Sequence, residues 1–142
     1  MSTYYDLLER IHAVLRPKLY VEIGVHEGHS LGLVHAGTRI VGVDPEPKVA
    51  EPPPDSTIVA QTSDDFFADP LALAEESIDL AFVDGLHWWE QTLRDVANLE
   101  HHASPDGTIL IHDCNPIDEI TSARARTTVV WSGDVWKTVV AL

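Results

Sequence analysis

Residues 19–28 read Leu-Tyr-Val-Glu-Ile-Gly-Val-His-Glu-Gly, an apolar run that passes into a loop of glycine and acidic residues. The run over residues 19–25 predicts a buried strand, because nearly continuous apolar residues are typical of strands covered on both faces. Polar residues just after such a strand lie where open parallel sheets bind their ligands. The same pattern recurs in four other segments: residues 39–44, 56–62, 78–84 and 108–113.

Helical patterns separate these strands. Helices are expected over residues 4–15, 28–35, 69–76 and 88–100, with a turn over residues 104–107. Strands that alternate with helices predict an α/β fold. We expect a Rossmann-like, doubly wound parallel sheet of at least five strands with flanking helices.

Two segments depart from this alternation. Residues 45–55 hold five of the nine prolines, so this crossover is expected to be an extended loop rather than a helix. Residues 114–142 contain a helical pattern after Gly133, but they are too few to complete a sheet edge.

The composition is that of a globular protein: 142 residues, 44% hydrophobic and 23% charged. We expect a single domain over residues 1–142. Nine Lys and Arg against 23 Asp and Glu give a net charge of −14, which excludes nucleic-acid binding through a broad basic face. No stretch approaches the ~20 apolar residues of a membrane span. The lack of a membrane span means that no membrane binding is expected. The one cysteine, Cys114, excludes an internal disulfide, which fits a reducing compartment, so we expect a cytoplasmic protein.

Glu22, Gly24, Gly28 and Asp44 together favour nucleoside binding, although each glycine alone is more typical of a plain turn. Glycines let the backbone turn sharply and approach a ligand closely. The loop lacks the G-x-G-x-x-G dinucleotide fingerprint, and its acidic residues disfavour a pyrophosphate. Asp44 ends its strand where a carboxylate can accept hydrogen bonds from both ribose hydroxyls. A ligand with hydroxyls and a positive charge fits this set.

Four motifs carry a family resemblance: Glu22-Ile-Gly-Val-His-Glu-Gly28, Gly42-Val-Asp44, Phe82-Val-Asp-Gly-Leu-His87 and Pro105-Asp-Gly-Thr-Ile-Leu-Ile-His-Asp113. In this order they resemble class I S-adenosylmethionine-dependent methyltransferases. The likeness is greatest to small O-methyltransferases with a D-G-x-H motif and an H-D pair after the fifth strand. The proline-rich crossover departs from that family, and the sheet is expected to lack the last strands of its usual seven.

The resemblance implies a cofactor site. Glu22 and the glycine loop would hold the methionine part of S-adenosylmethionine, and Asp44 would hold the ribose. Ser63 and Asp64 would border the adenine.

The same resemblance implies Asp84 and Asp113 as ligands of a divalent metal. Neighbouring parallel strands lie ~4.8 Å apart, so carboxylates at two adjacent strand ends can share one ion. Two oxygen ligands suit Mg²⁺ better than Zn²⁺. The alternative is that one carboxylate caps the following helix and the other is solvated.

His87, three residues after Asp84, is the candidate general base, because a histidine titrates near neutral pH. The alternative is a helix-start histidine bonded to a backbone carbonyl. His112 fits three roles, as ligand, base or partner of Asp113. Trp88 is the better pocket candidate, whereas Trp89 falls on an apolar helix face.

These residues predict an S-adenosylmethionine-dependent methyltransferase that methylates a hydroxyl of a small molecule with the help of Mg²⁺. A first alternative is a cofactor-binding protein, or a shortened methyltransferase without activity of its own. A second is a nicotinamide-dependent dehydrogenase, which the missing fingerprint disfavours. An incomplete sheet edge is also compatible with a homo-oligomer.

Overall fold

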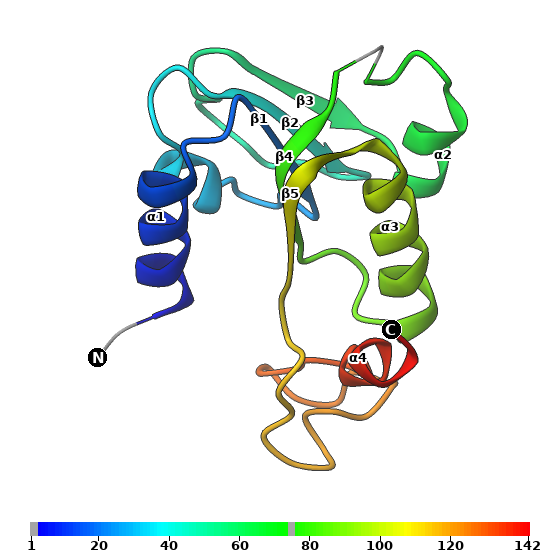
Figure 1. The fold of residues 1–142 in the computed structure, drawn as a ribbon. Coiled ribbons are helices and arrows are strands. Elements are labelled where there is room, and N and C mark those ends of the chain that lie inside the picture. The colour runs from blue at the N-terminus through cyan, green and yellow to red at the C-terminus, as the bar shows by residue number, and fades with distance from the viewer. Residues whose placement is uncertain (1–2, 74–75) are drawn as a thin grey trace.

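A five-stranded parallel sheet forms the centre of the computed structural model, which describes residues 3–73 and 76–142 (Figure 1). In chain order the strands are β1 (Leu19–Ile23), β2 (Arg39–Asp44), β3 (Ser56–Ala60), β4 (Ile78–Val83) and β5 (Ala103–Ile111). Their order across the sheet is β3-β2-β1-β4-β5, and every neighbouring pair is parallel. The expected α/β class and the five parallel strands are confirmed.

Helices cover both faces of the sheet (Figure 1). The helical elements are α1 (Tyr4–Leu15), the 3₁₀ turn η1 (Ser30–Leu33), α2 (Ser63–Ala68), α3 (Trp89–His102) and α4 (Trp136–Ala141). Successive residues of a strand point to opposite faces, so β1 contributes to two buried clusters. Val21 lies in the cluster that includes Phe66 of α2 and Leu99 of α3. Tyr20 lies in the other, with Leu8 of α1.

The expected helix over residues 4–15 forms as α1. The Thr3 side chain accepts the backbone N–H of Asp6, whose carboxylate accepts the N–H of Thr3 at 2.6 Å, an arrangement known as a capping box. The helix ends at Leu15, and the next residue, Arg16, takes a left-handed conformation with a φ of 46° directly before Pro17.

Two expected helices are wrong in extent or place. The helix expected over residues 28–35 is reduced to η1. The helix expected over residues 69–76 is absent over 69–73, and residues 74–75 lie outside the described part. A short helix instead begins six residues earlier as α2, because the Thr62 hydroxyl accepts the N–H of Asp65 and caps it. The Asp69–Pro70 pair therefore follows a helix instead of starting one.

The expected turn over residues 104–107 lies inside β5, where the pairing with β4 shifts between Ile78 and Leu80. Residues 45–55 form neither helix nor strand, as expected from their prolines. After β5 the described chain adds no further strand, and α4 packs against α3 (Figure 1). Among the described residues, no helix is long and apolar enough to cross a membrane.

Candidate active site

A cavity of about 770 Å³ opens at the carboxyl edge of the sheet, around the ends of β1 and β4. The chain turns from β1 toward β2 on one side, while β4 lies on the other, and ligands of open α/β sheets bind at such a reversal. The cavity wall contains all the residues that the sequence suggested as cofactor-binding residues, metal ligands or general base: Glu22, Gly24, Gly28, Asp44, Ser63, Asp64, Asp84, His87 and Asp113.

Glu22, at the end of β1, is only 1% exposed. The Tyr20 hydroxyl donates to its Oε2 at 2.6 Å, and the Ser30 hydroxyl donates to its Oε1. Burial raises the pKa of Glu22 to about 7, although these two hydrogen bonds oppose the rise. Because it is almost fully buried, Glu22 presents little free surface to a ligand, and its hydrogen bond with Ser30 connects β1 to the following loop.

Gly24 and Gly28 have positive φ angles, of 88° and 77°. A Cβ on Gly24 would lie 2.1 Å from the backbone oxygen of Asp84, and one on Gly28 would lie 3.0 Å from a methyl of Val49. The sequence predicts that a ligand lies against these glycines. The structure shows that neighbouring loops approach them, so Gly24 lets the loops after β1 and β4 meet.

Asp44, the last residue of β2, is held by backbone amides. The N–H of His26 donates to Oδ2 and the N–H of Glu46 donates to Oδ1, each at 2.8 Å. Each carboxylate oxygen can accept a further hydrogen bond. The structure thus orients two acceptor oxygens at the cavity wall.

Gln91 of α3 was not singled out from the sequence, yet it connects the residues expected near the adenine. Its Nε2 is 3.1 Å from Ser63 Oγ and 3.0 Å from both Asp64 Oδ1 and Asp95 Oδ1. Asp95 is buried, and burial raises its pKa. Residues four apart on a helix share a face. The spacing of Gln91 and Asp95 was therefore the feature of the sequence that could have predicted their contact.

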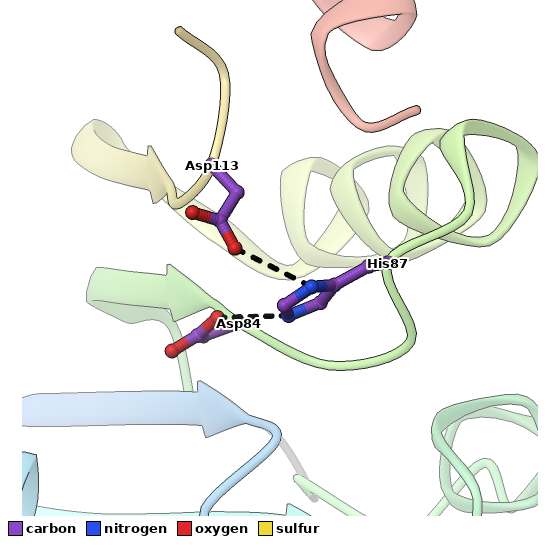
Figure 2. A group of neighbouring side chains, drawn as sticks. All are labelled: Asp84, His87 and Asp113. Carbon is purple, nitrogen blue, oxygen red and sulfur yellow. Dashed lines mark ion pairs between the residues drawn. The ribbon is translucent and has the colours of Figure 1, made fainter. Parts of the chain in front are cut away.

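Asp84, His87 and Asp113 lie together where β4 and β5 end (Figure 2). The His87 ring lies between the two carboxylates, with Nε2 3.4 Å from Asp84 Oδ1 and Nδ1 3.4 Å from Asp113 Oδ2. Asp113 has a φ of 58°, a left-handed conformation that turns the chain directly after β5. The sequence placed these residues at neighbouring strand ends, and the structure brings them into one cluster.

His112 is the fourth titratable group of this cluster. Its Nδ1 lies 3.2 Å from Asp84 Oδ1 and 3.4 Å from Asp113 Oδ1, but it makes no hydrogen bond of good geometry. Burial by itself lowers the pKa of His112, but the two carboxylates outweigh it and raise that pKa to about 10. Its ring also contacts Tyr4 of α1, with centroids 4.3 Å apart.

The net pKa shifts of Asp84 and His87 each favour the charged form of the side chain. Burial alone would raise the pKa of Asp84, but the two histidines outweigh it and the net shift is downward. Burial alone would lower the pKa of His87, but Asp84 and Asp113 outweigh it and the net shift is upward. The same electrostatic attraction between carboxylate and imidazole thus shifts the pKa values of both Asp84 and His87.

These donors fit a divalent cation. One ligand atom each from Asp84, His87 and Asp113 lies within 4.8 Å of the others, and the unbonded His112 Nδ1 is adjacent. A cation of charge +2 would neutralise the two carboxylates of Asp84 and Asp113. A nitrogen donor beside two carboxylates widens the expected choice from Mg²⁺ to other divalent metals.

Residues 114–142, the tail, contact this cluster through Trp131. Nothing in the sequence indicated this contact. Its backbone oxygen is 2.9 Å from His87 Nδ1, and its ring stacks on the imidazole with centroids 5.1 Å apart. A Cβ on Gly133 would lie 1.9 Å from the backbone oxygen of His87. The buried Asp134 accepts the N–H of Trp89 at 3.1 Å. The tail therefore packs directly on the first turn of α3.

Trp88 does not take the pocket position expected for it. Its side chain is absent from the cavity wall, and the guanidinium of Arg124 lies 4.7 Å from its ring centroid. Arg124 is also 2.8 Å from the carboxylate of Glu90. Trp88 is thus part of the contact between the tail and α3.

The sequence matches the family model described as a methyltransferase domain over residues 21–114, more than half of the chain. No curated protein matches it. Two solved structures resemble the fold. The S-adenosylmethionine complex of the O-methyltransferase TomG from Streptomyces achromogenes, involved in tomaymycin synthesis, has a TM-score of 0.74 at 14% identity. The S-adenosylhomocysteine-bound methyltransferase PaMTH1 from Podospora anserina has a TM-score of 0.62 at 20% identity.

The first match covers 98% of this chain and 67% of TomG, and the second covers 80% of this chain and 54% of PaMTH1. The chain thus spans about two thirds of the length of TomG and about half of that of PaMTH1, which is consistent with the expected shortened sheet. At these identities the likeness establishes the fold, while the match over residues 21–114 establishes the family. The chain therefore belongs to the methyltransferase-domain family, among the class I S-adenosylmethionine-dependent methyltransferases.

Proposed function

We propose that the chain binds S-adenosylmethionine in the cavity at the carboxyl edge of the sheet and methylates a hydroxyl of a small molecule. The observation that carries this proposal is the convergence of Asp44, at one end of the cavity, and the Asp84–His87–Asp113 cluster at the other. The volume of about 770 Å³ lies within the ~300–1,000 Å³ typical of ligand pockets. When bound, S-adenosylmethionine supplies a methyl group on a positively charged sulfur.

The residues near β1, β2 and α2 support the cofactor half of the proposal. Asp44 offers two oriented oxygens, as ribose hydroxyls require. Ser63 and Asp64 form the wall next to Gln91, where a flat base would find both donors and acceptors. The surrounding acidic side chains favour a ligand that carries a positive charge.

His87 supports the second part of the proposal, the methylation of a hydroxyl. The bond to the Trp131 oxygen uses Nδ1, which leaves the lone pair of the neutral ring on Nε2. Nε2 can accept the proton of a substrate hydroxyl, and Asp84 Oδ1, 3.4 Å away, stabilises the charge that results. Holding the acceptor in line with the methyl group can contribute ~7–11 kcal/mol to catalysis.

Asp84 and Asp113 are the residues that would hold a divalent metal, with Mg²⁺ the first candidate. When bound, the metal lowers the pKa of the acceptor hydroxyl and orients it. His87 Nε2 cannot ligate a metal and accept a proton at the same time. We therefore assign the two carboxylates to the metal and His87 to the proton.

Methyl transfer from isotopically labelled S-adenosylmethionine to a panel of phenols, sugars and aliphatic alcohols tests the proposal. We expect transfer to at least one hydroxyl compound, and its loss in His87→Ala. Cofactor binding without transfer to any compound would support the second candidate, a cofactor-binding unit.

A further inference from the structure

The tail brings one cation to an otherwise acidic cavity. Among the described residues that line the cavity, Arg126 is the one lysine or arginine. The acidic residues of the wall are Glu22, Glu27, Asp44, Asp64, Asp84, Asp95 and Asp113. With a net charge of −14, the protein as a whole repels small anions. Arg126 therefore adds a local attraction for an anion to a predominantly acidic site.

The guanidinium of Arg126 keeps most of its donors available. Its Nε is 3.5 Å from the backbone oxygen of Thr128, and its Nη2 is 3.2 Å from that of Val129. A guanidinium has five N–H donors, so three are not engaged by these contacts. In the part of the chain that the structure describes, no carboxylate lies within 4.0 Å of it. Arg124, in contrast, pairs with Glu90 at 2.8 Å.

Arg126 lies on the acceptor side of the cavity. Its guanidinium is 5.9 Å from the ring centroid of Trp131, and that ring stacks on His87. Asp44, in contrast, belongs to β2, on the far side of β1 from β4. An anion held by Arg126 would thus be part of the molecule whose hydroxyl reaches His87.

We propose that Arg126 binds a carboxylate of the acceptor, so that the enzyme selects hydroxy acids over neutral hydroxyl compounds. This inference rests on the proposed function, because the acceptor is the molecule that Arg126 would orient. Guanidinium and carboxylate are both planar and can form two parallel hydrogen bonds, which gives orientation as well as affinity. Tyr4 and Tyr5 also line the cavity, so aromatic hydroxy acids are suitable probes.

The test is calorimetric binding of 2-, 3- and 4-hydroxybenzoate and of the matching hydroxybenzamides to the full chain, with and without S-adenosylhomocysteine. Binding requires no turnover. We expect at least one acid to bind tenfold or more tightly than its amide, and Arg126→Gln to remove most of that preference. Arg126→Lys should retain part of it. Arg10→Gln, which makes the same charge change on the exposed side of α1, should retain all of it.

Equal binding of acids and amides, absence of binding by every acid, or an unchanged preference in Arg126→Gln would overturn the inference. So would an Arg126→Gln variant that binds S-adenosylhomocysteine more weakly but keeps the preference for acids, since Arg126 would then hold the cofactor's carboxylate. If acids bind through Arg126 and no methyl transfer occurs, the proposed function alone is contradicted. If acids and amides are methylated equally well, this inference alone is contradicted.

Discussion

The backbone oxygen of Trp131 lies 2.9 Å from Nδ1 of His87, across 44 residues of chain. A carbonyl oxygen accepts hydrogen bonds and never donates them, so Nδ1 carries the hydrogen and the neutral ring keeps its lone pair on Nε2. The tail therefore selects the tautomer of the candidate base. This contact depends on how the tail is attached to α3.

Asp134 is the main attachment. Asp134→Ala removes the acceptor for the N–H of Trp89 and leaves Arg124 and Lys137 without their buried partner. We expect the free energy of unfolding to fall by about 1–2 kcal/mol, as for loss of a helix cap, and turnover to fall with it. The two ion pairs add little, because both cations are 47% exposed. Urea unfolding and steady-state kinetics measure the two effects.

Asp106→Ala, at an exposed position within β5, is the control and should change stability by less than about 0.5 kcal/mol. Equal effects of the two substitutions would show that Asp134 does not hold the tail.

Gly24 and Gly37 form a matched pair for testing the contact between the loops after β1 and β4. Their φ angles are 88° and 89°, but a Cβ on Gly24 would meet the Asp84 backbone at 2.1 Å, whereas one on Gly37 meets nothing within 4 Å. Gly37→Ala should cost about 1–2 kcal/mol from backbone strain alone. Gly24→Ala should cost several kcal/mol or prevent folding, as measured by urea unfolding. Similar losses would argue against the close contact.

Much of the fold was predictable because it depends on local patterns. The apolar runs of β1 and β2 are buried strands, and their alternation with helices predicts the parallel pairing that the sheet shows. The place of α2 was missed because the Asp69–Pro70 pair looks like a helix start, whereas the cap is Thr62. A short helix has little intrinsic stability, so its position depends on tertiary packing.

The candidate site, like the fold, was predictable only in part. Residues at strand ends, such as Asp44 and Asp84, were predictable because a parallel sheet brings its carboxyl ends to one edge. Trp131 and Arg126 were not, because they belong to a tail without regular pattern. Their positions depend on contacts far apart in the sequence, such as the one between His87 and Trp131.

His12 predicts a dependence of stability on pH. It is 1% exposed, its ring nitrogens have no hydrogen-bond partner, and burial lowers its pKa from 6.5 to about 4. Below pH 6.5 the unfolded chain takes up a proton that the folded chain refuses, so stability is lost as the pH falls toward 4. Relative to His12→Phe, the wild type should lose about 2 kcal/mol between pH 7.5 and pH 5.

The comparison with the variant is needed because Glu22 acts in the opposite direction. Its pKa is raised to about 7 in the folded state, so its contribution is present at low pH and is lost as the pH rises through 7. Urea unfolding of both proteins at the two pH values measures the difference. Exposed His101→Gln serves as the control, and parallel pH profiles of wild type and His12→Phe would contradict the prediction.

Asp84→Asn tests the proposed metal. It should abolish turnover while leaving S-adenosylmethionine affinity within about threefold, because Asp84 belongs to the acceptor side. Wild-type turnover should disappear in chelator and return with Mg²⁺ or Mn²⁺. Calorimetry with Mn²⁺ should show one site that is lost in Asp84→Asn and Asp113→Asn and kept in Asp106→Asn. Full turnover in metal-free buffer with chelator would refute metal assistance.

Binding of S-adenosylmethionine to the purified chain decides whether the cavity at the carboxyl edge of the sheet is a cofactor site. Isothermal calorimetry should show one site per chain, and Asp44→Ala should weaken the affinity about 10- to 100-fold, as expected for loss of hydrogen bonds to a charged acceptor. Asp106→Ala should leave the affinity unchanged. If the wild type does not bind S-adenosylmethionine, the account of the cavity is wrong, and if Asp44→Ala binds it equally well, Asp44 does not hold the ribose.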